Sequence, residues 1–222
     1  MKIDLHVHAR ERSLCCRSSQ KAQVEAAIAA GLDAIVFTDH HRLAHADKLD
    51  ELNETYAPFK IYGGVELTIG GEDILVLGIH DPILETKEFT YPELHAFVRE
   101  RSGFMAVAHP YRFHPGIKLP LAEYLPDAIE VCSSNTRPEM LEEIVALARQ
   151  LNIAPLSNSD AHAAKIIGSH YNVLDHPVNS EAELVEALRR GRFSCLVPGS
   201  DGAVRRFRKE SIDGRKHGSA KG

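Results

Sequence analysis

The sequence alternates apolar, strand-like stretches with helix-like stretches over most of its length, and this alternation limits the fold more than any other feature. The expected strands are residues 2–8, 33–40, 60–69, 72–80, 103–110, 127–134, 153–162 and 192–197. The expected helices are residues 18–30, 43–57, 92–101, 137–151 and 180–190. Repeated β–α alternation favours an α/β fold with a parallel sheet, either a closed barrel or a doubly wound open sheet.

Residues with metal-binding or acid–base chemistry recur at the carboxyl ends of the expected strands. They are His6, His8, Asp39, His40, Glu66, His109, Asp160 and His162. A barrel gathers its site from the carboxyl ends of many strands, whereas a doubly wound sheet uses one switch point. No glycine-rich nucleotide-binding pattern follows any strand. The sequence therefore favours a barrel.

The segment DLHVH, residues 4–8, places two histidines on one face of an extended strand, because residues two apart point to the same side. For one H-x-H alone, two histidines on the exposed face of an edge strand is the better interpretation. The sequence has 13 histidines, however, and several lie in the clusters DLHVH, TDHH, AHP and SDAH. This repetition favours a metal site.

The types of residue in these clusters indicate the kind of metal site. Imidazole and carboxylate ligands together suit Zn, Mn or Fe(II). A structural zinc site has four closed ligands, often cysteines, whereas this set is larger and poor in cysteine. It is typical of a polynuclear catalytic centre, in which a carboxylate such as Glu66 can bridge two ions.

Five motifs, DLHVH, TDHH, GGVELT, AHPYR and SDAH, occur in this order. In this respect the chain resembles the PHP (polymerase and histidinol phosphatase) family, from residue 2 to about residue 176. The resemblance implies a distorted (β/α)7 TIM-like barrel with its metal site at the carboxyl ends of the strands. It also implies two or three divalent metal ions and hydrolysis of phosphoesters by a hydroxide that bridges the ions.

The resemblance implies the following residue roles. His6, His8 and Asp160 would bind the first metal. Glu66 would bridge to a second metal, which His109 would also hold. His40 and His162 would hold a third. The expected catalytic residues are Glu66, His40, Asp160 and Arg112; Arg112 is either a phosphate clamp, because a guanidinium matches a phosphate group, or part of an ordinary loop salt bridge.

The chain departs from the family pattern at two places. The loop after DLHVH lacks the further histidine or aspartate of many members; Glu11, Cys15 or Cys16 could replace it. Asp73 stands where members often have a histidine, and it could be a ligand of the second metal. His80, at the end of the same strand, is a competing candidate.

The composition excludes several classes of protein. Lys+Arg 26 against Asp+Glu 31 gives a formal charge of -5, which argues against a nucleic-acid binder that uses its whole surface. No apolar run is long enough for a membrane span, and no signal peptide is evident. Four cysteines, two of them adjacent, do not make a disulfide framework. We expect a cytoplasmic protein without an obligate protein partner.

The length of 222 residues suits one catalytic barrel, residues 1–202, followed by a basic segment, residues 203–222. That segment is expected to be a flexible or partly docked tail, and the alternative is a contact for a polyanion such as RNA.

Three functions are compatible with these residues. The favoured one is hydrolysis of a phosphomonoester or small phosphodiester, with a small phosphorylated substrate. The first alternative is an exonuclease that acts on the ends of short single-stranded nucleic acid. The second is a catalytically degenerate module that only binds metal.

Overall fold

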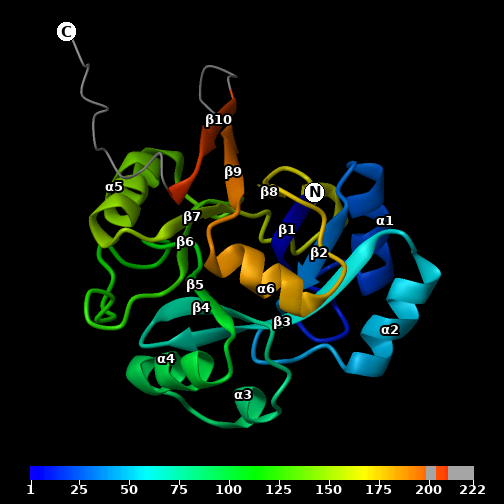
Figure 1. The fold of residues 1–222 in the computed structure, drawn as a ribbon, viewed down its shortest axis with the longest axis horizontal. Helices are drawn as coiled ribbons and strands as arrows, with labels where there is room; N and C mark the ends of the chain where they lie inside the picture. Colours follow the sequence, from blue (N-terminus) through cyan, green and yellow to red (C-terminus); the bar gives the residue numbers. More distant parts are fainter. Residues whose placement is uncertain (199–203, 210–222) are drawn as a thin grey trace, which may run out of the picture.

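The computed structural model describes residues 1–198 and 204–209, which form a mixed α/β fold (Figure 1). Ten strands form one sheet, in the order β10-β9-β8-β1-β2-β3-β4-β5-β6-β7. The strands are β1 (Lys2–Val7), β2 (Ala34–Phe37), β3 (Lys60–Ile69), β4 (Glu72–Leu77), β5 (Phe104–Val107), β6 (Ala128–Cys132), β7 (Ala154–Ser157), β8 (Tyr171–Leu174), β9 (Phe193–Pro198) and β10 (Val204–Phe207). The α-helices are α1 (Gln20–Ala29), α2 (Ala46–Thr55), α3 (Ile83–Thr86), α4 (Tyr91–Glu100), α5 (Leu141–Leu151) and α6 (Glu181–Arg189). Two 3-10 turns, η1 (Pro138–Met140) and η2 (Ala164–Ile166), complete the described elements.

All the strands and helices expected from the sequence are present, most of them shorter by a few residues at their ends. One α-helix and two strands were not expected: α3, β8 and β10. Each has four residues, which is too short for a hydrophobic period to be recognised. In β10 the sequence VRRF is also dominated by charge, and the strand exists because it pairs antiparallel to β9.

The sheet curls into a nearly closed barrel, which confirms the predicted fold class. The pairs β1–β2, β2–β3, β5–β6 and β6–β7 are parallel. The pairs β3–β4, β4–β5, β1–β8 and β8–β9 are antiparallel. At the gap, an isolated bridge joins Val7 of β1 to Ala161, just beyond β7. The count of seven β/α units stays a prediction, because these antiparallel pairs interrupt the regular alternation.

The turn between β3 and β4 is the two-residue hairpin that Gly70-Gly71 predicts. Ile69 pairs with Glu72 across it, and both glycines have positive φ, at 61° and 90°. Two consecutive residues with positive φ are the requirement of the type I′ turn, which matches the twist of a hairpin. The turn sets the register that places Thr68 opposite Asp73.

An irregularity in β1 changes which way its side chains face. The register of the β1–β2 pair shifts between Asp4 and Val7. Leu5 packs in the same apolar cluster as residues of β4, β5 and α6, whereas Val7 packs with residues of α1 and α2. Because neighbouring residues of a strand alternate in direction, His6 and His8 point away from α1 and α2, toward the barrel interior.

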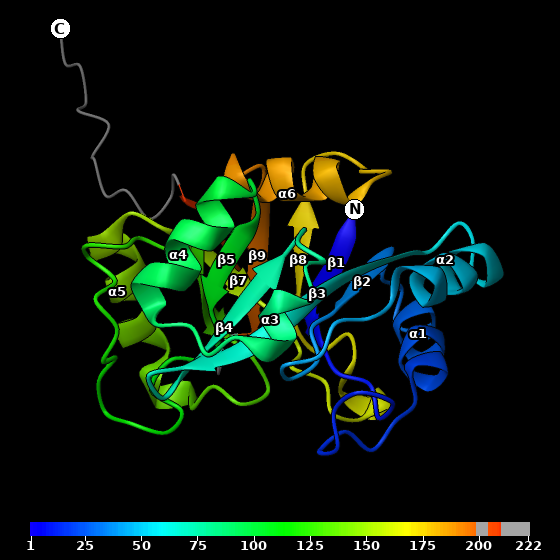
Figure 2. The same ribbon diagram turned by 90° about the horizontal axis from the view of Figure 1, so that it is seen from below.

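The two ends of the barrel have different coverings. Helix α6 lies across one end, as Figure 2 shows, and the loops that follow β1 and β7 lie at the other. Leu184, Val185 and Leu188 of α6 are almost fully buried, and each such side chain stabilises the fold by about 1.5–3 kcal/mol. Among the described residues, no helix has the length and apolar content that crossing a bilayer requires.

Candidate metal centre

The structure brings all eight predicted metal ligands together at the end of the barrel opposite α6, where the loops after β1 and β7 lie. His6 lies on β1 and His8 just beyond it, His40 follows β2, Glu66 lies on β3, and Asp73 on β4. His109 follows β5, and Asp160 and His162 follow β7. Four groups have potential ligand atoms that all lie within 4.8 Å of one another: His6 with His8 and Glu66, His6 with His109 and Asp160, Glu66 with Asp73 and His109, and His8 with His40 and His162. The groups overlap, as expected for a polynuclear centre.

Glu66 is the central residue of the cluster. It reaches this position because β3 extends beyond the end of β2, where a parallel bridge joins Glu66 to His40. Its Oε1 accepts a hydrogen bond from His109 Nε2 at 3.1 Å and lies 3.3 Å from His6 Nε2. Its Oε2 lies 2.8 Å from His40 Nδ1 and 3.4 Å from His8 Nε2. A carboxylate with imidazoles on both oxygens has the geometry of a bridging ligand.

Asp160 is a second carboxylate shared by several histidines. Its Oδ1 lies 3.1 Å from His8 Nε2, 3.4 Å from His6 Nε2 and 3.3 Å from His162 Nδ1. Its Oδ2 accepts a hydrogen bond from the side chain of Asn135 and lies 3.7 Å from His109 Nε2. Asp160 thus connects the first and second predicted sites, and also contacts the group around His162.

Asp73 is held at the edge of the cluster by its strand neighbour. Thr68 Oγ1 donates a 2.6 Å hydrogen bond to Asp73 Oδ1, and the other oxygen lies 3.9 Å from His109 Nε2. Asp73 therefore occupies the side of the second predicted site. The competing candidate, His80, joins none of the four groups. Its Nε2 is paired instead with the carboxylate of Glu181 at 2.6 Å.

Six of the eight predicted ligands are buried, His40 and His162 are partly exposed, and the cluster is strongly coupled electrostatically. Burial opposes the charged forms of Glu66 and Asp160, but His6 and other imidazoles hold the pKa of both carboxyl groups well below the usual range. Burial would also lower the pKa of His6, but Asp160, Glu66 and Glu130 raise it well above its usual value. Burial dominates at His8 and lowers its pKa. The centre therefore combines ionised carboxylates with imidazoles, the donors that divalent ions require.

One atom in particular indicates that these residues fit a metal ion. His6 Nε2 is fully buried and makes no hydrogen bond, although three carboxylates surround the ring. Buried polar atoms without a partner are rare and call for an explanation. A metal ion held by His6 together with Glu66 and Asp160 would satisfy this nitrogen.

The backbone is strained at several of these positions. His109 and Asp160 have φ values of 21° and 49°, and His41, next to His40, has 52°. Such values are uncommon for residues other than glycine and cost free energy, so they persist only where the surroundings fix them. Here they occur where the chain turns away from a strand and directs a side chain at the cluster.

Glu130, which was not among the predicted site residues, supports two of the predicted ligands. Glu130 lies on β6 and is fully buried. Its Oε1 lies 3.2 Å from His6 Nδ1 and accepts a 2.8 Å hydrogen bond from Asn158 Nδ2. Its Oε2 accepts a 2.9 Å hydrogen bond from the backbone N–H of His109. An isolated acid within the apolar strand AIEVC was the signal that could have revealed it.

Asp39 lies behind His8 and supports it indirectly, through a residue of the loop after β1. It is buried, and it accepts hydrogen bonds from Ser13 Oγ at 2.6 Å and Arg12 Nε at 2.7 Å. Ser13 Oγ lies 3.4 Å from His8 Nδ1. This chain of contacts fixes the loop after β1 against the ring of His8.

Arg112 projects toward the cluster from the loop after β5. Its Nη1 lies 3.4 Å from His109 Nε2 and 3.6 Å from Asp160 Oδ2, and its guanidinium lies 4.9 Å from the centre of the Phe113 ring. Arg112 lines a cavity of about 470 Å³ together with Cys15, His40, Asp73, Phe113 and His162. Arg112 therefore lies beside the predicted ligands and forms an ion pair with Asp160, and its two predicted roles, phosphate clamp and loop salt bridge, both stay predictions.

Three residues of the loop after β1 are candidates to replace the further histidine or aspartate that many family members have there. Glu11 accepts a hydrogen bond from the backbone of Gln20, at the start of α1. The sulfur of Cys16 is directed at the backbone oxygens of His8, Ser18 and His162. Cys15 lines the cavity but belongs to none of the four groups. The group of His40 and His162 is completed instead by His8.

The chain is similar to known proteins in one segment and in its fold. Residues 138–193 match a family model described as PHP-associated. No curated protein sequence matches the chain. A two-domain protein from Bacteroides vulgatus that contains a predicted PHP-like metal-dependent phosphoesterase superposes with a TM-score of 0.63 at 18% identity. That match covers 88% of this chain and 64% of the other, so this chain spans slightly less than two thirds of that protein.

Two further structures have a similar fold. A protein from Bifidobacterium adolescentis, assigned by inference as a metal-dependent phosphoesterase, has a TM-score of 0.61 at 15% identity over 72% of this chain and 87% of its own. An amidohydrolase from Chromobacterium violaceum, solved with sulfate and without metal, has a TM-score of 0.59 at 14% identity over 91% of this chain and 100% of its own. Together with the PHP-associated segment, these similarities support the predicted assignment of this chain to the PHP family.

Proposed function

We propose that this protein is a metal-dependent hydrolase that cleaves a phosphomonoester or a small phosphodiester. The observation that carries the proposal is the buried cluster of five histidines and three carboxylates, arranged in four overlapping groups of ligand atoms. The unpartnered His6 Nε2 within it supports the presence of a metal ion. The PHP-like phosphoesterases that share the fold support the same class of reaction.

The ligands would be divided among two or three ions. His6, His8, Asp160 and Glu66 would hold the first, and Glu66, His109 and Asp73 the second. His40 and His162, with His8, would hold a third. Divalent ions such as Zn, Mn or Fe, when bound there, would polarise a phosphoryl oxygen and activate water at neutral pH.

The protein's own residues would position the phosphate group. The guanidinium of Arg112 lies between the ring of Phe113 and the carboxylate of Asp160. There it can donate two parallel hydrogen bonds to a phosphoryl group that enters the cavity. Glu66, His40 and Asp160 would act as ligands around the reacting group, and the carboxylates of Glu66 and Asp160 are buried from solvent.

The architecture around the cluster favours a small or accessible substrate over a long polymer. Between His109 and Asp160 the chain forms only β6, η1, α5 and β7 with their connecting loops. No additional helical segment is inserted there to build a channel over the cluster. An exonuclease that acts on short single strands would need such a binding channel, and it remains the alternative that the experiment must test.

The test combines metal analysis with a substrate panel. Protein purified without chelator is analysed for Zn, Mn and Fe, then assayed on aryl phosphates, sugar phosphates, nucleotides, a small phosphodiester and a labelled oligonucleotide. We expect bound metal and hydrolysis of a small phosphoester, both greatly reduced in Asp160→Asn and unchanged in the exposed control Asp50→Asn. Metal binding without turnover of any substrate would support a degenerate module, and preferential shortening of the oligonucleotide would support the exonuclease.

A further inference from the structure

Strand β10 presents two different faces. Alternate residues of a strand point to opposite sides. Arg205 forms an ion pair with Glu142 of α5 at 2.8 Å, and Phe207 packs against the apolar core on that side. Arg206 and Arg208 therefore share the opposite face, where Arg208 makes hydrogen bonds of 2.6 and 3.1 Å to the two carboxylate oxygens of Asp175. The alternation places two arginines of this basic segment on the outer surface of the described fold.

Arginine side chains from the end of α6 and the turn after it lie on the same surface. Arg189 ends α6, and Arg190 and Arg192 flank Gly191 in the following turn. The backbone N–H of Asp175, the partner of Arg208, donates to the backbone oxygen of Arg192 at 3.0 Å. A methyl group at Gly191 would lie 3.8 Å from the Cβ of Lys209. These contacts join two distant segments into one basic face, defined as Arg189, Arg190, Arg192, Arg206, Arg208 and Lys209.

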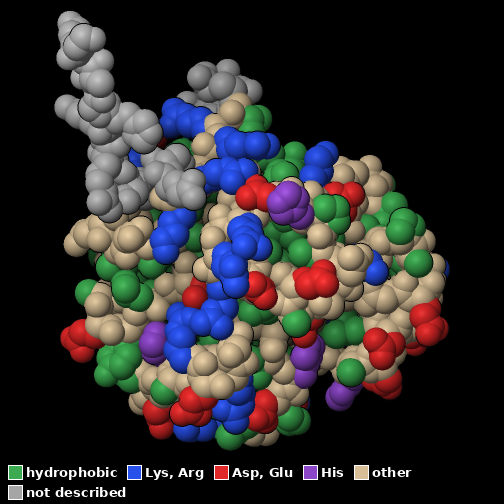
Figure 3. Space-filling model, in the orientation of Figure 1, with side chains coloured by type: hydrophobic (Ala, Val, Ile, Leu, Met, Phe, Trp, Pro, Cys, Tyr) green, Lys and Arg blue, Asp and Glu red, His purple; other side chains and the backbone are tan. Residues whose placement is uncertain are grey.

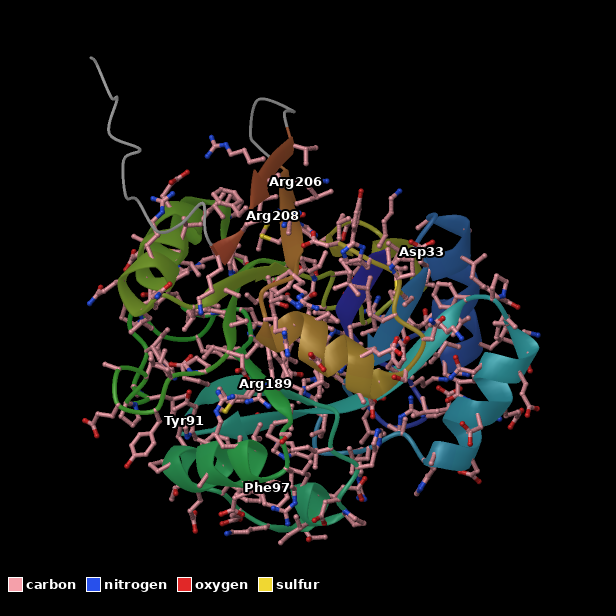
Figure 4. All side chains as sticks on the ribbon, in the orientation of Figure 1. Asp33, Tyr91, Phe97, Arg189, Arg206 and Arg208 are labelled. Carbon is pink, nitrogen blue, oxygen red and sulfur yellow. The ribbon has the colours of Figure 1, made fainter. Side chains whose placement is uncertain are left out.

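Several cations of the basic face form no ion pair with an acid in the described part of the chain, although the hydrogen bond from Arg208, together with the charge of Arg206, lowers the pKa of Asp175. Arg190 pairs with Glu186, and Arg208 pairs with Asp175. In residues 1–198 and 204–209, no carboxylate lies within 4.0 Å of the charged groups of Arg189, Arg192 or Arg206. Figure 4 shows Arg189 near the end of α6 and Arg206 and Arg208 on and beside β10, and Figure 3 shows Lys and Arg side chains gathered over β10 and α6. A surface with excess positive charge in a chain of net charge -5 requires an explanation.

Most of the basic face lies at the end of the barrel opposite the metal centre, and Arg206 lies farther along β10, where it pairs with Leu196 of β9. Strand β9 runs parallel to β1, because both are antiparallel to β8. Phe193, at the start of β9, pairs with Leu174, whose backbone N–H donates to the oxygen of Met1. Arg192 is thus level with the beginning of β1, whereas His6 and His8 lie at its other end. A ligand on the basic face would not occupy the catalytic cavity.

The shape of the surface favours an extended ligand. Its cations come from α6, the turn after it, and β10, so one phosphate ion could contact only a few of them. Beside α6 lies a cavity of about 660 Å³, which is lined by three arginines and two glutamates: Arg101, Arg189, Arg190, Glu181 and Glu186. Guanidinium groups match phosphate oxygens in pairs, and a chain of phosphodiesters would meet several of them in succession.

We propose that the basic face binds the sugar–phosphate backbone of a single-stranded nucleic acid, independently of the metal centre. A membrane surface is less suitable, because interfacial binding requires large apolar side chains to enter the lipid. Among the exposed large apolar side chains of the described residues, only Val204 lies on the elements that carry the basic face. Arginine contacts to phosphates would give affinity that depends strongly on salt and little on sequence.

The test measures binding of a labelled single-stranded phosphorothioate oligonucleotide, which keeps its charge and resists hydrolysis, by fluorescence anisotropy at several salt concentrations. The variant carries Arg189→Gln, Arg192→Gln and Arg206→Gln. The control variant carries Lys21→Gln, Lys48→Gln and Arg149→Gln, with the same change in charge on α1, α2 and α5. We expect the first variant alone to lose about tenfold in affinity, with a salt slope smaller by about two.

Three results would overturn the proposal. They are the absence of binding by the wild type, equal losses in the two variants, and binding of anionic phospholipid vesicles in place of the oligonucleotide. Thermal unfolding of both variants shows whether either substitution has disturbed the fold. The outcome is independent of the proposed function, because the basic face can bind the oligonucleotide whether or not the metal centre hydrolyses phosphoesters.

Discussion

His6 Nδ1 and Glu130 Oε1 lie 3.2 Å apart, and both side chains are fully buried. With its Nδ1 directed at a carboxylate, the ring of His6 is fixed in orientation and turns Nε2 toward Glu66 and Asp160. A carboxylate behind a ligating imidazole fixes its tautomer and increases its basicity as a ligand. Glu130 also accepts from the backbone of His109, so one side chain orients two of the predicted ligands.

We predict that Glu130→Gln lowers metal affinity by about 10–100-fold. Glutamine retains the size of the side chain but has one acceptor oxygen, so it cannot satisfy both His6 and the backbone of His109. Competition with a chromophoric chelator measures the affinity. Glu139→Gln, at an exposed position of η1, is the control. Unchanged metal affinity in Glu130→Gln would show that Glu130 has only a packing role.

The pattern of the sequence was sufficient for the main elements of the fold. The hydrophobic runs and the Gly70-Gly71 turn depend on local preferences, which can be recognised without knowledge of the partners. Helix α1 begins after Ser19, a residue type favoured at this position, and Ser19 Oγ accepts a hydrogen bond from the backbone N–H of Ala22. Strands β8 and β10 were not expected because each has only four residues and is defined by its antiparallel pairing with β9.

The candidate site likewise contains residues that could be predicted from the sequence and residues that could not. The ligands were recognisable because histidines and acids recur at strand ends, where topology brings them together. Glu130, Asn135 and Asn158 were not, because their contacts join residues that are at least 21 positions apart. A side chain that supports a ligand from another strand carries no pattern of its own. The contribution of His8 to the group of His40 and His162 likewise depends on the three-dimensional arrangement.

Metal removal should lower the stability of the fold. Glu66 and Asp160 are buried, and a bound ion would compensate charges that otherwise repel one another. An ion present at a hundred times its dissociation constant stabilises the native state by about 2.7 kcal/mol. For a chain of this length, this corresponds to roughly 5–10 °C in Tm. Differential scanning fluorimetry with EDTA, and after the addition of Zn or Mn, measures the shift.

The variant Asp160→Asn provides the comparison for this prediction. It removes one shared ligand and keeps the shape of the side chain, so the metal-dependent rise in Tm should become smaller. A rise in Tm that is equal in the wild type and in Asp160→Asn would place the stabilising ion elsewhere.

Replacement of the Arg112 guanidinium should impair catalysis without loss of metal. In Arg112→Lys a single ammonium group cannot reproduce paired hydrogen bonds to a phosphoryl group. A hydrogen bond to a charged group contributes about 1.5–3 kcal/mol, so kcat/KM on a phosphoester substrate should fall by about 10–100-fold. Elemental analysis should find the same metal content as in the wild type.

The control for Arg112 is Arg42→Lys. Arg42 follows β2, is exposed and pairs with Glu85 rather than with the cluster. Its kcat/KM should remain at the wild-type value. If Arg112→Lys retained full activity with its metal content intact, Arg112 would be an ordinary loop residue and not a phosphate clamp.

The ion pair of His80 and Glu181 lies away from the predicted metal ligands, and it should make the stability of the fold depend on pH. The hydrogen bond to Glu181 raises the pKa of His80 above its usual 6.5. Because the folded protein holds the proton more tightly than the unfolded chain, the pair stabilises the fold fully below pH 6.5. This contribution is lost as the pH rises through the raised pKa of the folded state.

We therefore predict that Glu181→Gln lowers the free energy of unfolding at about pH 6 and has a smaller effect at about pH 9. Both side chains are partly exposed, so solvent screening limits the difference to about 0.5 kcal/mol. Urea unfolding at the two pH values measures it. Glu186→Gln, on the same helix, removes the partner of Arg190, whose charge does not change over this range. The control should therefore change stability equally at both pH values, and an equal change for Glu181→Gln would contradict the assignment of the pH dependence to His80.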